Sequence, residues 1–120
     1  MRVLVVDDSK AMRMIIKRAL RQAELPNLEV VEAENGRRAY DAIKGAGKFD
    51  LILCDWNMPV MSGIELLQKL NAERFTVSFG FVTSESTAAM RSQAREAGAL
   101  FLLTKPFTAG MLKEHLDRAA

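Results

Sequence analysis

Five side chains able to do chemistry follow short apolar runs of the sequence, at the points where those runs end. They are three acids, one hydroxyl and one amine: Asp7, Asp8, Asp55, Thr83 and Lys105. Carboxylates that lie close together repel one another, and they stay ionised at neutral pH only if positive charge lies between them. A divalent cation such as Mg²⁺ (or Mn²⁺) prefers oxygen ligands and often shares carboxylates with phosphate groups. If the fold brings these residues together, they predict a site that binds a divalent cation and accepts a phosphoryl group.

Each of these residue types can take part in phosphoryl transfer. A carboxylate can act as a nucleophile and become an aspartyl phosphate. The Lys105 ammonium can neutralise phosphoryl oxygens, and the Thr83 hydroxyl can donate a hydrogen bond to one of them. Phosphoryl transfer depends on positioning and charge neutralisation more than on acid–base catalysis. The chain has one His and one Cys, so we do not expect a zinc site.

The elements that must position these groups alternate along the chain. Short apolar runs rich in β-branched or bulky residues predict strands at residues 3–6, 28–31, 51–54, 77–82 and 100–103. Amphipathic segments between them predict helices that begin near Ser9, Asn35, Ser62, Ser86 and Thr108. Such alternation favours an α/β fold, a parallel sheet covered by helices on both faces. Function gathers beyond the carboxyl ends of the strands in such sheets, so we expect all five side chains along one edge.

Composition places the chain among ordinary globular domains. It has 120 residues, of which 49% are hydrophobic and 27% charged, and its formal net charge is +2. This length fits one domain, and so weak a charge gives no reason to expect nucleic acid as a partner. No apolar run reaches the roughly 18 residues that would span a membrane, so membrane insertion is not expected. A single cysteine fits a reducing, cytoplasmic location.

Other polar residues have structural explanations. Cys54 ends an entirely apolar run, which favours a buried, inert thiol. His115 lies beside the apolar stripe of the last helix without a partner motif, and we interpret it as structural or solvated. The basic residues of the first helix (Lys10, Arg13, Lys17 and Arg21) are interpreted as a solvated face, with a docking surface as the less favoured reading.

Four motifs in order give the chain a family resemblance. They are VVDDS at residues 5–9, DWNMP with MSG at 55–59 and 61–63, VT at 82–83, and KPF at 105–107. Together they resemble the receiver domain of bacterial two-component response regulators, particularly the stand-alone chemotaxis receivers. The resemblance covers residues 1–120 as a single receiver domain without an output domain. It implies a doubly wound, flavodoxin-like sandwich of five parallel strands in the order 2-1-3-4-5 with five helices.

The resemblance also assigns roles to site residues. Asp55 would be the phosphoacceptor, with Mg²⁺ bound directly by Asp8, through water by Asp7, and by the backbone carbonyl of Asn57. The phosphoryl group would contact Thr83, Lys105 and the Ser84 amide. Asn57 and Glu85 would tune how long the phosphoryl group survives, and the same pair in fast-hydrolysing receivers favours a short lifetime. The Lys105–Pro106 peptide would be cis, as proline permits.

The implied function is a signalling switch. A sensor histidine kinase or phosphotransfer protein would donate the phosphoryl group, and the domain would catalyse its own phosphorylation and dephosphorylation without being an enzyme for other substrates. The surface of helix four, strand five and helix five would then change and control a partner protein, with the chain a monomer or weak dimer. Leu102 occupies the position where the family usually has a switch aromatic, three residues before Lys105. Phe101, the nearest aromatic, should point to the opposite face of the strand.

Three other functions fit parts of the sequence. An aspartate-nucleophile phosphatase of the haloacid-dehalogenase type places its nucleophile in a D-x-D pattern after the first strand, where this chain has adjacent Asp7 and Asp8. A flavin carrier of the same sheet type needs a phosphate-binding loop at that place, and two acids there repel phosphate. A phosphorylation-independent interaction module on a receiver scaffold remains open because of Leu102.

Overall fold

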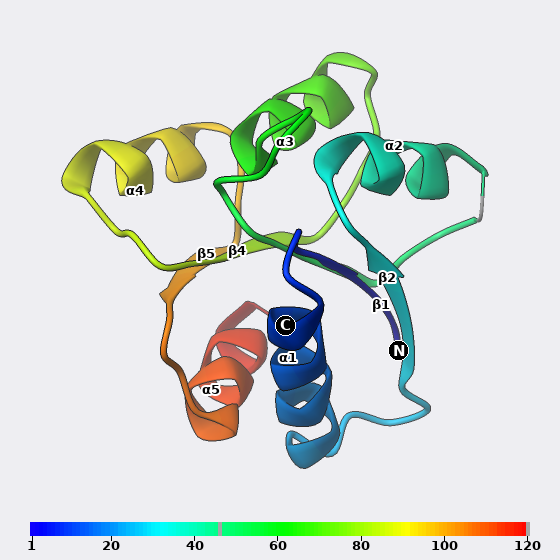
Figure 1. The fold of residues 1–120 in the computed structure, drawn as a ribbon, viewed down its shortest axis with the longest axis vertical. Helices are drawn as coiled ribbons and strands as arrows, with labels where there is room; N and C mark the ends of the chain where they lie inside the picture. Colours follow the sequence, from blue (N-terminus) through cyan, green and yellow to red (C-terminus); the bar gives the residue numbers. More distant parts are fainter. Residues whose placement is uncertain (46, 120) are drawn as a thin grey trace.

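Five strands and five helices alternate along the described part of the chain (Figure 1). The computed structural model describes residues 1–45 and 47–119, so the predicted domain end at Ala120 lies outside the described residues. The strands are β1 (Arg2–Val6), β2 (Glu29–Ala33), β3 (Leu51–Cys54), β4 (Phe79–Thr83) and β5 (Phe101–Thr104). The helices are α1 (Lys10–Gln22), α2 (Gly36–Gly45), α3 (Gly63–Ala72), α4 (Ala88–Glu96) and α5 (Ala109–Ala119). None of these helices is long and apolar enough to cross a bilayer.

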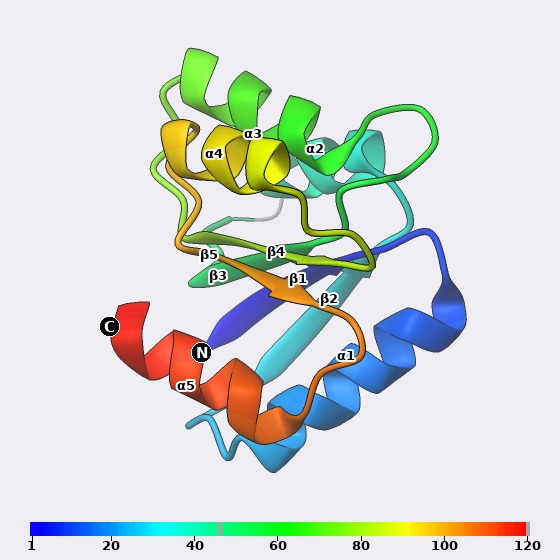
Figure 2. The same ribbon diagram turned by 90° about the vertical axis from the view of Figure 1, so that its left-hand side faces the viewer.

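The strands form one parallel sheet between two layers of helices. Their order is β2-β1-β3-β4-β5, and every pairing is parallel. Figures 1 and 2 show α1 and α5 on one face of this sheet and α2, α3 and α4 on the other. The predicted doubly wound α/β sandwich and its strand order are therefore confirmed.

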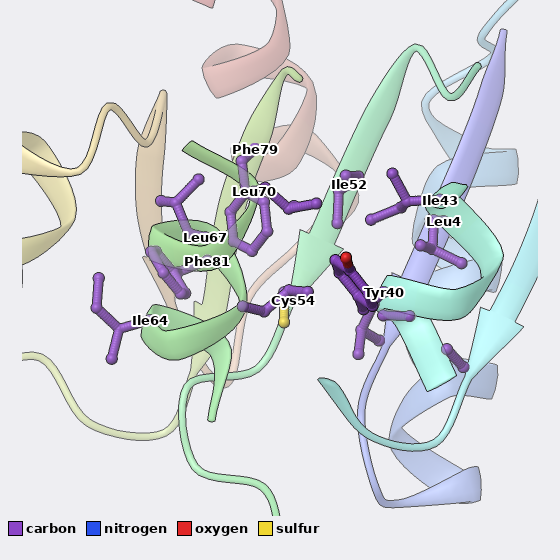
Figure 3. Packing of buried hydrophobic residues seen from close by; sticks show 14 of the residues in the cluster. Leu4, Tyr40, Ile43, Ile52, Cys54, Ile64, Leu67, Leu70, Phe79 and Phe81 are labelled. Carbon is purple, nitrogen blue, oxygen red and sulfur yellow. The ribbon is translucent and has the colours of Figure 1, made fainter. Parts of the chain in front are cut away.

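The core is divided by the sheet, because successive strand side chains point to opposite faces. Leu4, Ile52 and Phe79 pack with α2 and α3 on one face (Figure 3), whereas Val3 and Val5 pack with α1 and α5 on the other. β1, β3 and β4 are buried at nearly every position. The continuous apolar runs of the sequence are thus explained by burial on both faces.

The predicted helix starts are correct to within two residues. Ser9 and Ser62 are N-caps, and Ser62 forms the predicted capping box with Glu65. Thr87 rather than Ser86 caps α4. The second, fourth and fifth strands each begin one or two residues later than predicted, because apolar residues at the entrance to a strand cannot be separated by pattern from those within it.

A tight approach between β4 and β5 depends on Gly80. Gly80 and Phe101 are paired neighbours, and a Cβ added to Gly80 would lie 2.3 Å from the Phe101 ring. The ring fills the space that a side chain on β4 would take, and it also stacks on His115 of α5 at 5.1 Å between ring centroids. As predicted, Phe101 and Leu102 point to opposite faces.

We expect Gly80→Ala to lower the free energy of unfolding by about 1–3 kcal/mol, because the new methyl group must displace a buried ring. Gly110→Ala is the control, since a Cβ at Gly110 would meet only Thr108 Oγ1 at an ordinary 3.7 Å, and alanine favours a helix. Denaturant unfolding of both variants checks this. Equal stability of Gly80→Ala and the wild type would contradict the packing described for Phe101.

Candidate functional site

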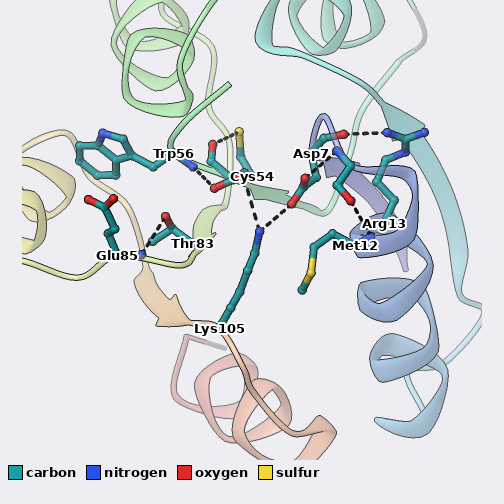
Figure 4. Close-up of polar contacts among 10 residues, drawn as sticks. Asp7, Met12, Arg13, Cys54, Trp56, Thr83, Glu85 and Lys105 are labelled. Atoms are coloured by element: carbon teal, nitrogen blue, oxygen red, sulfur yellow. Dashed lines mark hydrogen bonds and ion pairs between the residues drawn. The ribbon is translucent and has the colours of Figure 1, made fainter. Parts of the chain in front are cut away.

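The sheet brings the five predicted side chains to one edge. Asp7 and Asp8 follow β1, Asp55 follows β3, Thr83 ends β4, and Lys105 follows β5. Carboxylate oxygens of the three acids lie within 4.8 Å of one another. The Lys105 ammonium lies among them, 2.9 Å from Asp7 Oδ2 and 3.5 Å from Asp55 Oδ2 (Figure 4). Residues far apart in sequence therefore lie together at the carboxyl ends of the strands, as the sequence predicts.

Asp7 is the most enclosed of the three acids. Its side chain is 1% exposed and is bound at both oxygens. Oδ1 accepts a hydrogen bond from the Ser9 amide at 2.9 Å, and Oδ2 accepts from Lys105. The amide at the start of α1 and the ammonium together stabilise a charge that burial alone would disfavour.

Asp55 is also buried, but fewer short hydrogen bonds stabilise its carboxylate than stabilise that of Asp7. Oδ1 accepts a hydrogen bond from the Trp56 amide at 2.7 Å, while Oδ2 has only the longer contact with Lys105. Burial raises the pKa of Asp55, and Asp7 raises it further, whereas Lys105 lowers it. Together these effects leave the pKa of Asp55 above its ordinary value, so the fold disfavours the ionised carboxylate.

The remaining predicted residues surround this centre. Asp8, Asn57, Ser84 and Glu85 are exposed. Thr83 is completely buried, and its Oγ1 accepts a contact of 3.5 Å from the Glu85 amide. These five positions thus offer one buried hydroxyl and four groups open to solvent, as an accessible reaction site requires.

Two backbone features shape the loop after Asp55. A Cβ added to Gly63 would lie 2.2 Å from the Asp55 carbonyl oxygen, so only glycine fits here. The Gly63 amide donates a hydrogen bond to the Trp56 carbonyl oxygen at 2.8 Å and fastens the loop to the start of α3. On the opposite side of the site, the predicted cis peptide bond between Lys105 and Pro106 is present.

The arrangement of oxygens fits a divalent cation. Among the described residues, three carboxylates cluster here and the Lys105 ammonium pairs with two of them, so the centre has an excess of negative charge. Side chains of Asp7, Asp8 and Asp55 each offer one ligand oxygen to a common point. Oxygen donors without nitrogen or sulfur are the set that Mg²⁺ or Mn²⁺ prefers.

Arg13 was not identified from the sequence as a residue with structural contacts next to the site. Arg13 was interpreted as part of a solvated face, but its side chain is 15% exposed and pairs with Glu32 on β2, which Lys17 also binds. The sequence shows Arg13 and Lys17 four residues apart on one helix, but only the assembled sheet shows that Glu32 of β2 lies opposite both of them. The interpretations of Cys54 and His115 agree with the structure, since Cys54 is buried with a thiol pKa raised mainly by desolvation and His115 stacks on Phe101.

We expect Asp55→Asn to raise the free energy of unfolding at neutral pH, without divalent cations, by on the order of 1 kcal/mol, the usual size of a single-substitution effect. A raised pKa in the folded state means that stability is lost as pH rises through the carboxyl titration. Asparagine keeps an acceptor for the Trp56 amide and removes the charge.

Asp117→Asn serves as the control, because within residues 1–45 and 47–119 the only ion pair of Asp117 is the exposed one with Lys113, and such pairs contribute little. Chemical denaturation with EDTA present measures both variants. A less stable Asp55→Asn protein would show that the Lys105 ion pair outweighs burial and repulsion.

Known proteins with similar sequences and structures agree with this arrangement of strands and site. The response regulator receiver domain family matches residues 3–117. The chain is similar to chemotaxis protein CheY-3 of Vibrio cholerae, with 38% identity over 98% of this chain and 90% of that protein. It is 40% identical to the chemotaxis protein CheY homolog of Campylobacter jejuni over the same shares. The solved structure of V. cholerae CheY4 aligns with a TM-score of 0.84 and 30% identity, over 99% of this chain and 98% of the other. The receiver domain of the putative regulator NarL of Mycobacterium tuberculosis gives 0.85 and 31%, over 98% and 94%. The chain therefore belongs to the response regulator receiver family of two-component signalling.

Proposed function

We propose that the protein is a phosphorylation-activated switch that accepts a phosphoryl group on Asp55 from a histidine kinase or a phosphotransfer protein. One observation carries the proposal: a buried, poorly compensated Asp55 carboxylate lies in one cluster with two further acids and the Lys105 ammonium. The proposed setting is the cytoplasm, where the lone Cys54 thiol stays reduced.

A divalent cation completes the proposed site. Mg²⁺ or Mn²⁺ would be held by Asp7, Asp8, Asp55 and the backbone carbonyl of Asn57. Bound there, the cation supplies positive charge between the carboxylates and the oxygens of the incoming phosphoryl group.

The chain's own residues then have distinct parts. Oδ1 of Asp55 is held by the Trp56 amide, which leaves Oδ2 to attack phosphorus. A P–O bond forms at Oδ2 as the P–N bond of the donor phosphohistidine breaks, and the imidazole leaves with the electron pair. Lys105, already 3.5 Å from Oδ2, pairs with the phosphoryl oxygens, and Thr83 and the Ser84 amide donate hydrogen bonds to them. Hydrolysis transfers the phosphoryl group from Asp55 to water and restores the carboxylate. The exposed Asn57 and Glu85 border the path of the attacking water.

The experiment that tests this step uses Trp56, the only tryptophan. Its amide binds Asp55 and its ring packs on Phe81 with 4.7 Å between centroids. Mg²⁺ followed by a small acyl-phosphate donor should change the Trp56 fluorescence and add one phosphoryl mass to the wild type. Asp55→Asn should gain no mass, because the amide is a poor nucleophile.

Removing the donor and following the added mass gives the lifetime of the phosphorylated state. The exposed Asn57 and Glu85 lead us to expect loss within minutes rather than hours. A wild type that gains no mass with Mg²⁺ and donor present contradicts the switch, and steady release of phosphate from small phosphate esters would point to a phosphatase instead.

The proposed output surface is the one formed by α4, β5 and α5. A groove of about 580 Å³ lies on it, bordered by Arg91, Arg95 and Arg118 and floored by Leu100, Phe101 and Leu102. A mixture of arginines with apolar side chains, of which Leu100 is exposed here, is typical of surfaces that bind proteins. Nothing more than a downstream protein partner is proposed for it.

Leu102 connects this groove with the reaction site. It packs against the core cluster that contains Phe81, its neighbour in the ladder, and it lines the groove. Thr83 and Thr104 are paired farther along the same ladder, and the Lys105 amide binds the Thr83 carbonyl oxygen. We propose that a shift of Thr83 toward the phosphoryl group moves β5 and repacks Leu102. α4 has only Ala94 buried, so few contacts oppose its movement.

Hydrogen exchange measured by mass spectrometry should therefore change in α4 and β5 when the protein is phosphorylated, and α2 at the other side of the sheet should stay as it was. Asp55→Asn treated with the same donor is the control. Phosphorylation without any change in α4 or β5 would contradict the proposed output surface and favour the phosphorylation-independent interaction module.

A further inference from the structure

A basic side chain behind the acidic edge has no part in the chemistry proposed above. Arg13 lies on α1, and its guanidinium contacts two other segments; Figure 4 shows the contact with Asp7. Nη1 donates a hydrogen bond to the backbone carbonyl oxygen of Asp7 at 2.7 Å. Nε donates to Oε1 of Glu32 at 3.0 Å. The guanidinium therefore joins the turn after β1 to strand β2.

Glu32 holds the guanidinium in this place. Lys17, one turn farther along α1, donates to Oε2 of Glu32 at 3.1 Å. The hydrogen bond from Lys17 is the largest cause that lowers the pKa of Glu32, and Arg13 lowers it as well. An ionised Glu32 attracts Arg13 toward β2, so the guanidinium binds the Asp7 carbonyl rather than the carboxylates of the site.

The hydrogen bond from Arg13 to the Asp7 carbonyl affects the position of Asp8. This carbonyl belongs to the peptide group that joins the two residues, and because that group is planar, its direction sets how the chain enters Asp8. Asp7 has side-chain contacts of its own to Ser9 and Lys105. Within the described residues, no hydrogen bond or ion pair holds the exposed Asp8 carboxylate, so its position depends on the backbone.

We infer that Arg13 is a positioning residue, which acts through the Asp7 carbonyl to aim the Asp8 carboxylate at the divalent-cation site. The inference rests on the proposed function, because that function assigns Asp8 to the cation. It does not depend on phosphorylation, and it can be tested without a phosphoryl donor.

The direction of the effect separates positioning from simple electrostatics. If the positive charge of Arg13 acted only through space, its removal would raise the affinity for Mg²⁺. If Arg13 positions Asp8, its removal lowers that affinity, and loss of such indirect supports commonly costs about 10–100-fold.

Arg13→Met and Lys17→Met form a matched pair for the test. Each removes one positive charge and one hydrogen bond to Glu32, but only Arg13→Met removes the bond to Asp7. Titration calorimetry with Mg²⁺, checked by Trp56 fluorescence, should show binding weakened about tenfold or more in Arg13→Met. Lys17→Met should stay within about twofold of the wild type, because exposed ion pairs contribute little.

Arg13→Lys is the second variant, since it keeps the charge but lacks the planar fork that reaches two acceptors; it should also bind Mg²⁺ more weakly. Circular dichroism without Mg²⁺ checks that every variant is folded. Wild-type or tighter Mg²⁺ binding in both Arg13 variants would overturn the inference and leave the proposed function intact. A wild type that binds no Mg²⁺ would instead overturn the proposed function.

Discussion

The ammonium of Lys105 between Asp7 and Asp55 is the interaction on which the acidic edge depends. It joins the ends of β5, β1 and β3, across 98 and 50 residues of sequence. One ammonium against three carboxylates leaves an excess of two negative charges. Like charges at this separation are destabilising, and burial strengthens their interaction because water no longer screens it. The rest of the sandwich must therefore provide the stability that holds this edge together, and a divalent cation has the charge that balances it.

Each carboxylate is supported in a different way, and the differences match different chemical tasks. Asp7 is bound at both oxygens and forms a fixed anchor for Lys105. Asp55 is fixed at Oδ1 and nearly free at Oδ2, which suits the phosphoacceptor role proposed for it. Asp8 is exposed, and the backbone beside it is held through Arg13. A cation bound in the proposed site would therefore meet one ligand fixed at both oxygens, one with a free oxygen and one that is exposed.

The position of the site could be predicted from the sequence because each reactive residue follows an apolar run, and parallel strands bring their carboxyl ends to one edge. The N-cap roles of Ser9 and Ser62 could also be predicted, since a cap is a local hydrogen bond. The contact of Arg13 with Glu32 could not, because it depends on the distance from α1 to β2, which only the assembled sheet defines. For the same reason the fit of Phe101 over Gly80 could not be predicted, since it depends on the register between two strands.

The place of β5 in the sheet suits it to carry a signal. It is an edge strand and pairs only with β4, so its displacement disturbs one ladder of hydrogen bonds, whereas a central strand would disturb two. Lys105 follows its carboxyl end at the acidic edge, and Leu102 lies within it at the groove. The phosphoryl group proposed for Asp55 would therefore act on a strand that packs against α5 on one face. On its other side this strand meets α4, in which only Ala94 is buried, and it lines the groove that contains arginines. An aromatic side chain at position 102 is one way to couple these two places, but a strand that contributes residues to both would also couple them in the proposed switch.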